Sequence, residues 1–213
     1  GRLGIFCGSW YTQPIIDRVF RNIDRNAFES SLDDICKLES MLTAEGIILI
    51  KLWMYLSPNQ QKDILKLGKK KARTKWRVSA LTRKFARKRK RFYKVDIEAL
   101  TATHTAAAPW TMVPAQFARY REIFVGETLI KKLENSLGSD LPTIVPPARW
   151  QKAPRDFFAE LDMTKKLADA EYKEQFEKLS GRVAELSDRL SGSKKSVALV
   201  FEGADAAGKG GAI

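Results

Sequence analysis

The sequence contains no apolar run long enough to cross a membrane. A membrane-spanning helix needs roughly 20 consecutive apolar residues, and no stretch of the 213 residues approaches that length. The first residues also lack the basic and then apolar pattern of a secretion signal. These absences argue against an integral membrane protein, and we expect a soluble, cytoplasmic protein with no membrane partner.

Cysteine and histidine are scarce, with two cysteines and one histidine in the chain. Cys7 and Cys36 lie in apolar surroundings without the spacing of metal ligands, which argues against a disulfide framework or a zinc site. Because free cysteine is often buried, we expect both to be ordinary buried residues. His104 has no carboxylate near it in sequence, so we do not expect it to be catalytic.

Acidic residues are almost absent from residues 62–94, where sixteen Lys or Arg accompany Asp63 as the single acid. The whole chain carries a net charge of +13, so the rest of it is close to neutral. A concentrated positive charge indicates an anionic partner. Because a nucleic acid and other polyanions would serve equally well, this basic run does not choose between them.

Alternating apolar segments predict a parallel sheet with helices on both faces. Short apolar runs favour strands at 2–7, 46–57, 108–115 and 196–203, and we expect the first of these to be buried. Helices are predicted from Pro14, from an N-cap at Asn26, from Phe117 to near Gly138, and over 163–190. The basic run has apolar residues at intervals, so we expect it to be helical and docked.

The two ends of the chain and one internal segment interrupt these patterns. Four prolines fall between residues 139 and 154, which indicates a linker. The chain opens without Met inside an apolar run, and it stops just after a glycine-rich loop that should begin a helix. We therefore expect both ends to be cut within structured segments.

The last residues contain the G-x-x-x-x-G-K pattern of a phosphate-binding loop. Gly203, Gly208 and Lys209 satisfy it directly after a predicted strand, which is the context such a loop requires. Glycines let backbone N–H groups point at a phosphate, and Lys209 would reach its outer oxygens. Position 210 is Gly where Ser or Thr would bind Mg²⁺, so Asp205 is the predicted metal ligand. The predicted phosphate-binding residues are Gly203, Ala206, Ala207, Gly208, Lys209, Gly210 and Gly211, and Asp205 and Lys209 are the predicted catalytic residues.

Two segments carry a resemblance to a known family. VFEGADAAGKGG resembles the phosphate-binding loop of the type-2 polyphosphate kinases, in which the Asp and the two Gly after Lys are habitual. IFCGSWYTQPIIDRV resembles the Walker B region of the same family, usually F-D-R-S-W-Y followed by E-R-V. The matching residues are Ser9, Trp10, Tyr11, Arg18 and Val19. Cys7 stands where the family has its metal-binding Asp, and Gly8 stands where it has Arg.

The resemblance implies a P-loop kinase-like α/β fold with a basic helical lid, and an enzyme that transfers phosphoryl groups between inorganic polyphosphate and a nucleotide with the help of Mg²⁺. Residues 1–145 resemble the later part of one kinase domain, and residues 161–213 resemble the beginning of a second, catalytic one. The segment 146–160 would then be the linker of a tandem-domain member. The lid residues are Arg83, Lys84, Arg87, Lys88, Arg89, Lys90 and Arg91.

Because Cys7 and Gly8 leave the first Walker B position without a carboxylate, we expect a degenerate, structural first domain and an inactive fragment. Trp10 and Tyr11 follow a strand end, and we expect them to pack rather than to bind ligand. The implied partners are polyphosphate and AMP, ADP or ATP. Whether the protein forms a homo-oligomer is left undecided by the sequence. Two alternatives remain: a basic nucleic-acid-binding protein, and an ordinary ATP-dependent P-loop kinase.

Overall fold

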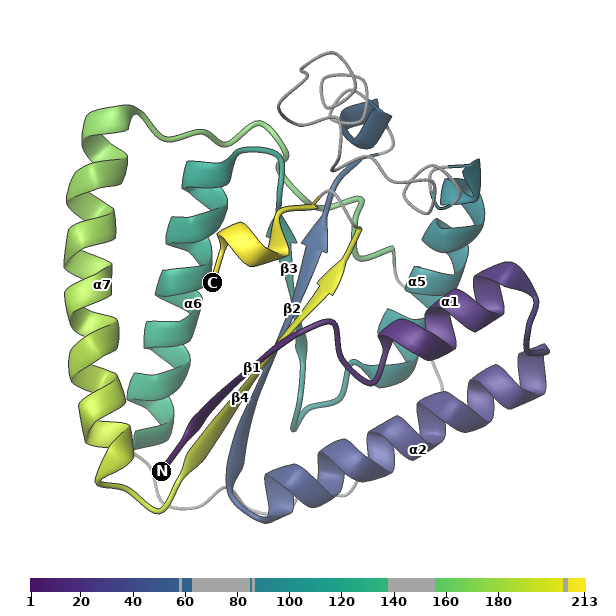
Figure 1. The fold of residues 1–213 in the computed structure, drawn as a ribbon, viewed down its shortest axis with the longest axis horizontal. Helices are drawn as coiled ribbons and strands as arrows, with labels where there is room; N and C mark the ends of the chain where they lie inside the picture. Colours follow the sequence, from purple (N-terminus) through teal and green to yellow (C-terminus); the bar gives the residue numbers. More distant parts are fainter. Residues whose placement is uncertain (58, 63–84, 86, 138–155, 205–206) are drawn as a thin grey trace.

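A single layer of strands lies between two layers of helices (Figure 1). The computed structural model describes residues 1–57, 59–62, 85, 87–137, 156–204 and 207–213. Its strands are β1 (Leu3–Cys7), β2 (Ile47–Tyr55), β3 (Trp110–Pro114) and β4 (Ser196–Gly203). Its helices are α1 (Thr12–Phe20), α2 (Arg25–Ala44), α5 (Arg89–Thr103), α6 (Ala118–Leu137), α7 (Asp169–Ser191) and the short 3₁₀ helix η3 (Lys209–Gly211). The predicted α/β class, a parallel sheet flanked by helices, is confirmed.

The sheet is parallel throughout, and its strand order is β1-β4-β2-β3. The last strand in sequence, β4, lies between the first two: Phe201 pairs with Cys7 on one side and with Leu52 on the other. The segment predicted to begin a second domain therefore supplies a central strand to the sheet. The predicted linker at 146–160 lies mostly outside the described residues, and the division into domains stays a prediction.

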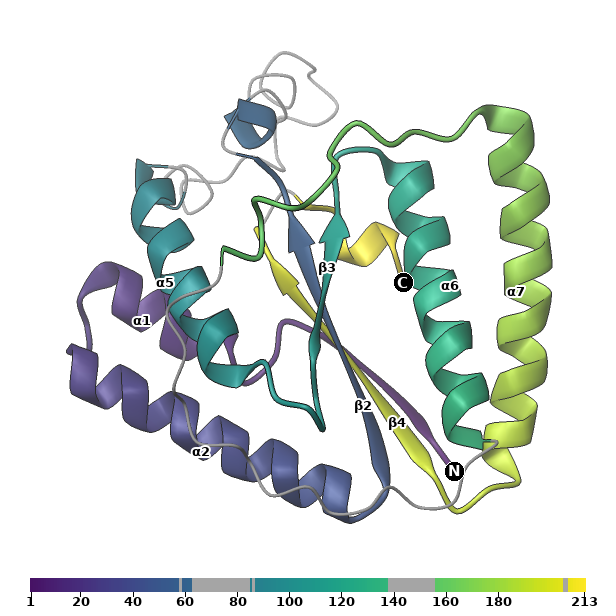
Figure 2. The same cartoon turned by 180° about the vertical axis from the view of Figure 1, so that it is seen from behind.

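Side-chain alternation along β2 divides the core in two. Leu49 and Trp53 pack with apolar residues of α1, α2 and α5, whereas Leu52 and Met54 pack with those of α6 and α7. Figures 1 and 2 show these two helix layers on opposite faces of the sheet. Because β2 and β4 are covered on both faces, their sequences are almost continuously apolar, as expected for central parallel strands.

Residues 2–7 were predicted to form a buried strand, and the prediction that this strand is buried is wrong. These residues do form β1, but Ile5 and Phe6 are 45% and 41% exposed. Among the described strands β1 pairs with β4 alone, so one of its edges has no covering strand. Cys7 lies at the end of this edge strand and is exposed, and Cys36 is half-buried, so neither is the buried residue that we expected.

Two helices begin at residues other than the predicted ones, and local hydrogen bonds explain both differences. The N-cap of α2 is Asp24 rather than Asn26, because the Asp24 side chain accepts a hydrogen bond from the Ala27 amide at 2.8 Å. Helix α7 begins at Asp169 rather than near Met163, since Asp162 accepts hydrogen bonds from both the amide and the hydroxyl of Thr164 in a local turn.

The described helices include none whose length and apolar content would allow it to cross a membrane.

Candidate phosphate-binding site

The loop after β4 begins and ends at glycines that the structure requires. Gly203 has a φ of 126°, and a Cβ there would lie 2.1 Å from the carbonyl oxygen of Met54. Gly208 has a φ of 75°, and a Cβ there would lie 2.6 Å from Cζ of Arg121. Both positions disfavour side chains because φ is positive, and at Gly203 the backbone of Met54 also leaves no room for a Cβ.

The predicted phosphate-binding residues fall into two groups. Gly203, Ala207, Gly208, Lys209, Gly210 and Gly211 surround the start of η3 at the carboxyl end of β4. Asp205 and Ala206 lie outside the described residues, so the prediction of Asp205 as a catalytic metal ligand stays a prediction. The strand that the phosphate-loop pattern requires before its first glycine is present as β4.

The side chain of Lys209 folds back onto its own loop. Its Nζ donates to the carbonyl oxygen of Gly203 at 2.8 Å and to that of Ala204 at 3.4 Å. Hydrogen bonds between an ammonium and a phosphate oxygen are stronger than those to a neutral carbonyl, because both partners are charged. An entering phosphate would therefore compete well for this ammonium.

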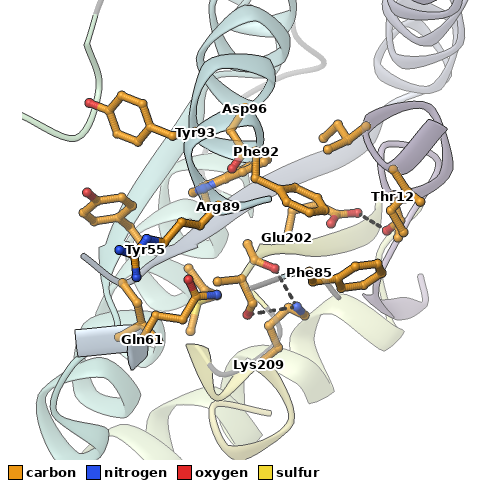
Figure 3. Close-up of a pocket in the computed structure, with 18 of the residues that line it drawn as sticks. Thr12, Tyr55, Gln61, Phe85, Arg89, Phe92, Tyr93, Asp96, Glu202 and Lys209 are labelled. Atoms are coloured by element: carbon orange, nitrogen blue, oxygen red, sulfur yellow. Dashed lines mark hydrogen bonds between the residues drawn. The ribbon is translucent and has the colours of Figure 1, made fainter. Parts of the chain in front are cut away.

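A carboxylate in β4 fastens the loop after β1 beside this site. Glu202 is 5% exposed, and its Oε1 accepts hydrogen bonds from the amide and hydroxyl of Ser9 at 2.8 and 2.7 Å. The Thr12 hydroxyl donates to the same oxygen at 2.8 Å (Figure 3). Sequence reasoning treated Glu202 only as part of a strand. A lone acid in an otherwise apolar strand was the signal that could have revealed it.

A buried ion pair holds the next two residues of the β1–α1 loop. Glu39 accepts hydrogen bonds from Trp10 Nε1 at 3.2 Å and from the Tyr11 hydroxyl at 2.5 Å, and Lys51 Nζ lies 2.7 Å from its other carboxylate oxygen. Burial and the Glu39 charge raise the pKa of Tyr11 above its usual value. Tyr11 is fully buried, as the packing interpretation expected.

A cavity of about 280 Å³ opens beside Lys209 at the carboxyl edge of the sheet. Ligand sites of open parallel sheets lie at this edge. Its apolar wall includes Trp53, Tyr55, Phe85, Phe92 and Tyr93. Its polar lining includes Gln61, Arg89, Asp96, Glu202 and Lys209 (Figure 3). The cavity therefore combines aromatic surface with groups of both charges.

The carboxyl group of Asp96, a residue of α5, lines this cavity. Burial raises its pKa well above the ordinary value, and the charge of Glu202 raises it further. The ammonium of Lys209 acts in the opposite direction. Sequence reasoning did not select Asp96, because it follows the basic run with no motif around it.

The predicted lid residues contribute unequally among those that are described. Arg89 lines the cavity, and Arg91 donates from Nη2 to the carbonyl oxygen of Arg18 at 3.1 Å. The remaining described lid residues, Arg87, Lys88 and Lys90, are exposed. Arg83 and Lys84 lie outside the described residues.

The predicted degenerate Walker B position also reaches the cavity. Cys7 and Gly8 line it at the end of β1, and Gly8 has a φ of 89°. The described residues contain no group of three or more His, Cys, Asp or Glu side chains placed to hold a metal ion. Because Mg²⁺ is usually held by one or two carboxylates together with substrate phosphates, the role of Asp205 in binding it stays a prediction.

Arg121 supports the loop from α6. It is 8% exposed, donates from Nη1 to the carbonyl oxygen of Ala115 at 3.0 Å, and lies against Gly208. Its Nε has no hydrogen-bond partner among the described residues. Burial lowers the pKa of this guanidinium, although Glu122 partly offsets the effect. Its sequence position gave no signal for this role.

Comparison with known proteins gives a consistent set of matches. The family model described as Polyphosphate kinase 2 (PPK2) matches residues 1–140 and 166–213. A polyphosphate:AMP phosphotransferase of Pseudomonas aeruginosa is 34% identical over 220 residues, which cover all of this chain and 44% of that protein. The corresponding protein of Pseudomonas syringae pv. tomato is 33% identical with the same coverage. An AMP/ADP-polyphosphate phosphotransferase of Meiothermus ruber is 29% identical over 63% of this chain and 50% of its own length. The chain thus spans less than half the length of the two Pseudomonas relatives.

Proposed function

Because the chain belongs to the Polyphosphate kinase 2 family, we propose that it carries part of an enzyme that transfers phosphoryl groups between inorganic polyphosphate and a nucleoside mono- or diphosphate. One observation carries the proposal: the loop of Lys209 opens onto a cavity that also holds Arg89 and several aromatic side chains. Phosphoryl transfer demands mainly positioning and positive charge around the transferred group. This arrangement supplies both.

Each described group has a definite task in this proposal. When phosphate binds, the Lys209 ammonium leaves the carbonyl oxygens of Gly203 and Ala204 and donates its hydrogen bonds to phosphate oxygens instead. Arg89 brings a second positive charge from the lid side of the cavity. The aromatic wall would shield one side of a bound ligand from water, which would strengthen the attraction between these cations and the phosphates.

Described residues near β1 and on α6 also support the proposed site. Ser9 and Thr12 hold Glu202 at the end of β4, and Arg121 supports Gly208. Cys7 lines the cavity but has no carboxylate like that of a Walker B motif. We therefore retain the prediction that this position has lost its role in metal binding. Magnesium stays a proposed cofactor with Asp205 as its ligand, and it would offset phosphate charge.

The first test measures binding of long-chain polyphosphate to the wild type and to Lys209→Ala. The expected loss is at least roughly tenfold, because a charge-assisted contact is removed. Lys194→Ala is the matched control, since Lys194 is exposed at the opposite end of β4 and its substitution changes the net charge equally. Binding should weaken with salt, as expected for a polyanion.

The second test supplies AMP or ADP with polyphosphate and Mg²⁺ to the full-length protein that contains this chain, because the chain alone is expected to be inactive, and it follows the formation of ADP or ATP. Product that requires polyphosphate supports the proposed donor. The same product made from ATP without polyphosphate would favour the ordinary ATP-dependent kinase. RNA binding that matches polyphosphate binding and is unchanged in Lys209→Ala would favour the nucleic-acid-binding alternative.

A further inference from the structure

The cavity beside Lys209 has two chemically different ends. Figure 3 shows Lys209 and Asp96 on opposite sides of the side chains drawn, with Glu202 between them. The end at Lys209 is formed by the glycine-rich loop between β4 and η3, here called the phosphate loop. The Asp96 end lies next to Phe92 and Tyr93 of the same helix, α5. A ligand with a phosphate at one end and a flat ring at the other would match both.

The aromatic walls suit a flat ring. Phe85 and Phe92 are in edge contact with their centroids 5.4 Å apart, and Tyr55 is held by stacking on Phe158 at 4.2 Å. The cavity volume of about 280 Å³ is close to the lower end of the roughly 300–1,000 Å³ typical of small-molecule sites. A single base and its sugar fit a space of this class better than a large ligand does.

The carboxyl group of Asp96 is available to such a ring. It is half-buried and lines the cavity, and no described residue donates a hydrogen bond to it. A bound ligand would remove this half-buried carboxyl group from water, so it must offer a hydrogen-bond partner to offset that cost. A ligand that offers a matching hydrogen-bonding edge would therefore gain affinity at this point.

We propose that the cavity takes the base of an adenine nucleotide, with the Asp96 carboxyl group pairing with the exocyclic amine and a neighbouring ring nitrogen while Lys209 faces the phosphates. This assignment rests on the proposed function, and it adds the base and the residue that reads it. Asp96 would accept from the amine and donate to the ring nitrogen, which requires its neutral form.

The surroundings of Asp96 favour that neutral form. Burial and Glu202 raise its pKa, and Lys209 only partly opposes them. The charged or titratable groups that line the same cavity are Arg89 and Tyr93 of α5, Tyr55 of β2, Cys7 of β1, Glu202 of β4 and Lys209. AMP should bind with its highest affinity at pH values below the pKa of Asp96, and the affinity should fall as the pH rises through that pKa. An ionised carboxylate only accepts, and it suits the two adjacent N–H donors of guanine.

The experiment is calorimetric titration with three probes: AMP, GMP, and the purine ribonucleoside monophosphate that lacks the exocyclic amine. Wild type should bind AMP roughly tenfold more tightly than the analogue, as loss of one buried hydrogen bond implies. Asp96→Asn should keep AMP affinity, because the amide also donates and accepts, and it should remove the pH dependence. Asp96→Leu should lose roughly tenfold in AMP affinity. Polyphosphate affinity should stay unchanged in both variants.

The outcomes separate this assignment from the proposed function. Equal wild-type affinity for AMP and the analogue overturns the assignment without any variant having to fold. AMP affinity that is unchanged in Asp96→Leu, or lost in Asp96→Asn, also overturns it, and intact polyphosphate binding would then leave the proposed function standing. Failure of wild type to bind polyphosphate, with AMP binding retained, overturns the donor but not the base assignment. Failure to bind either overturns both.

Discussion

Breaking the buried ion pair of Lys51 and Glu39 should strongly destabilise the protein. Lys51 is fully buried in β2, and its Nζ donates to Glu39 Oε2 at 2.7 Å, to the carbonyl oxygen of Thr103 at 2.7 Å and to the Tyr11 hydroxyl at 3.1 Å. The ammonium also lies 4.7 Å from the ring centroid of Trp110. Burial lowers the pKa of Lys51, and the Glu39 charge opposes this effect.

Lys51→Met fills the same space but leaves the Glu39 charge without its partner at 2% exposure. Removing one member of a buried pair typically costs about 3–5 kcal/mol, because an uncompensated charge stays buried. Lys51→Met with Glu39→Leu removes both charges, so the double variant should lose less than the sum of the single losses. It should still lose some stability, since the Thr103 carbonyl and the Tyr11 hydroxyl each lose a partner.

Urea unfolding followed by circular dichroism measures the free energy of unfolding of the wild type, the two single variants and the double variant. A favourable coupling energy between Lys51 and Glu39 is the expected result. Additive losses, or a loss of less than about 1 kcal/mol in Lys51→Met, would refute the reasoning, because the buried charge of Glu39 would then not depend on Lys51.

Two further predictions concern the phosphate loop. Gly208→Ala should lower the midpoint of thermal unfolding, since its φ of 75° strains a side chain and its Cβ would meet Arg121; in an Arg121→Ala background the loss should shrink, and equal losses in both backgrounds would contradict the steric cause. Thr12→Val should cost about 1.5–3 kcal/mol of unfolding free energy, because the Glu202 carboxylate loses a partly buried hydrogen bond, whereas Thr12→Ser should keep most of this stability. Urea unfolding of the two Thr12 variants checks this, and equal stabilities would show that Glu202 does not need that donor.

The phosphate loop illustrates how far the sequence could be interpreted. The spacing of Gly203, Gly208 and Lys209 after an apolar run is local, and it predicted both the strand β4 and the glycine-rich turn that follows. The family resemblance came from equally local residues around Ser9 and Lys209, and its family assignment is confirmed by the match over residues 1–140 and 166–213. The roles of the individual site residues stay predictions.

The sequence failed where exposure or pairing depends on distant segments. Apolar residues such as Ile5 predict a strand, but only the strand order shows that β1 is an edge among the described strands. Asp96 and Arg121 lie on two different helices and have no shared motif, so their approach to the phosphate loop could not be inferred. Glu202 directly precedes Gly203 in sequence, but its hydrogen bonds with Ser9 and Thr12 could not be inferred. The prediction of Asn26 as the N-cap of α2 was also wrong, because Asp24 is an equally good cap by residue type and lies two residues earlier.

The sequence by itself determined the main strands and helices and the glycine-rich turn after β4, because hydrophobic periodicity and glycine spacing act over a few residues. It determined neither the placement of β4 between β1 and β2 nor the cavity that results. That placement depends on burying apolar strands against partners far away in the chain. Only the tertiary structure could bring Asp96, Arg89 and Arg121 to a loop that lies about a hundred residues away in sequence.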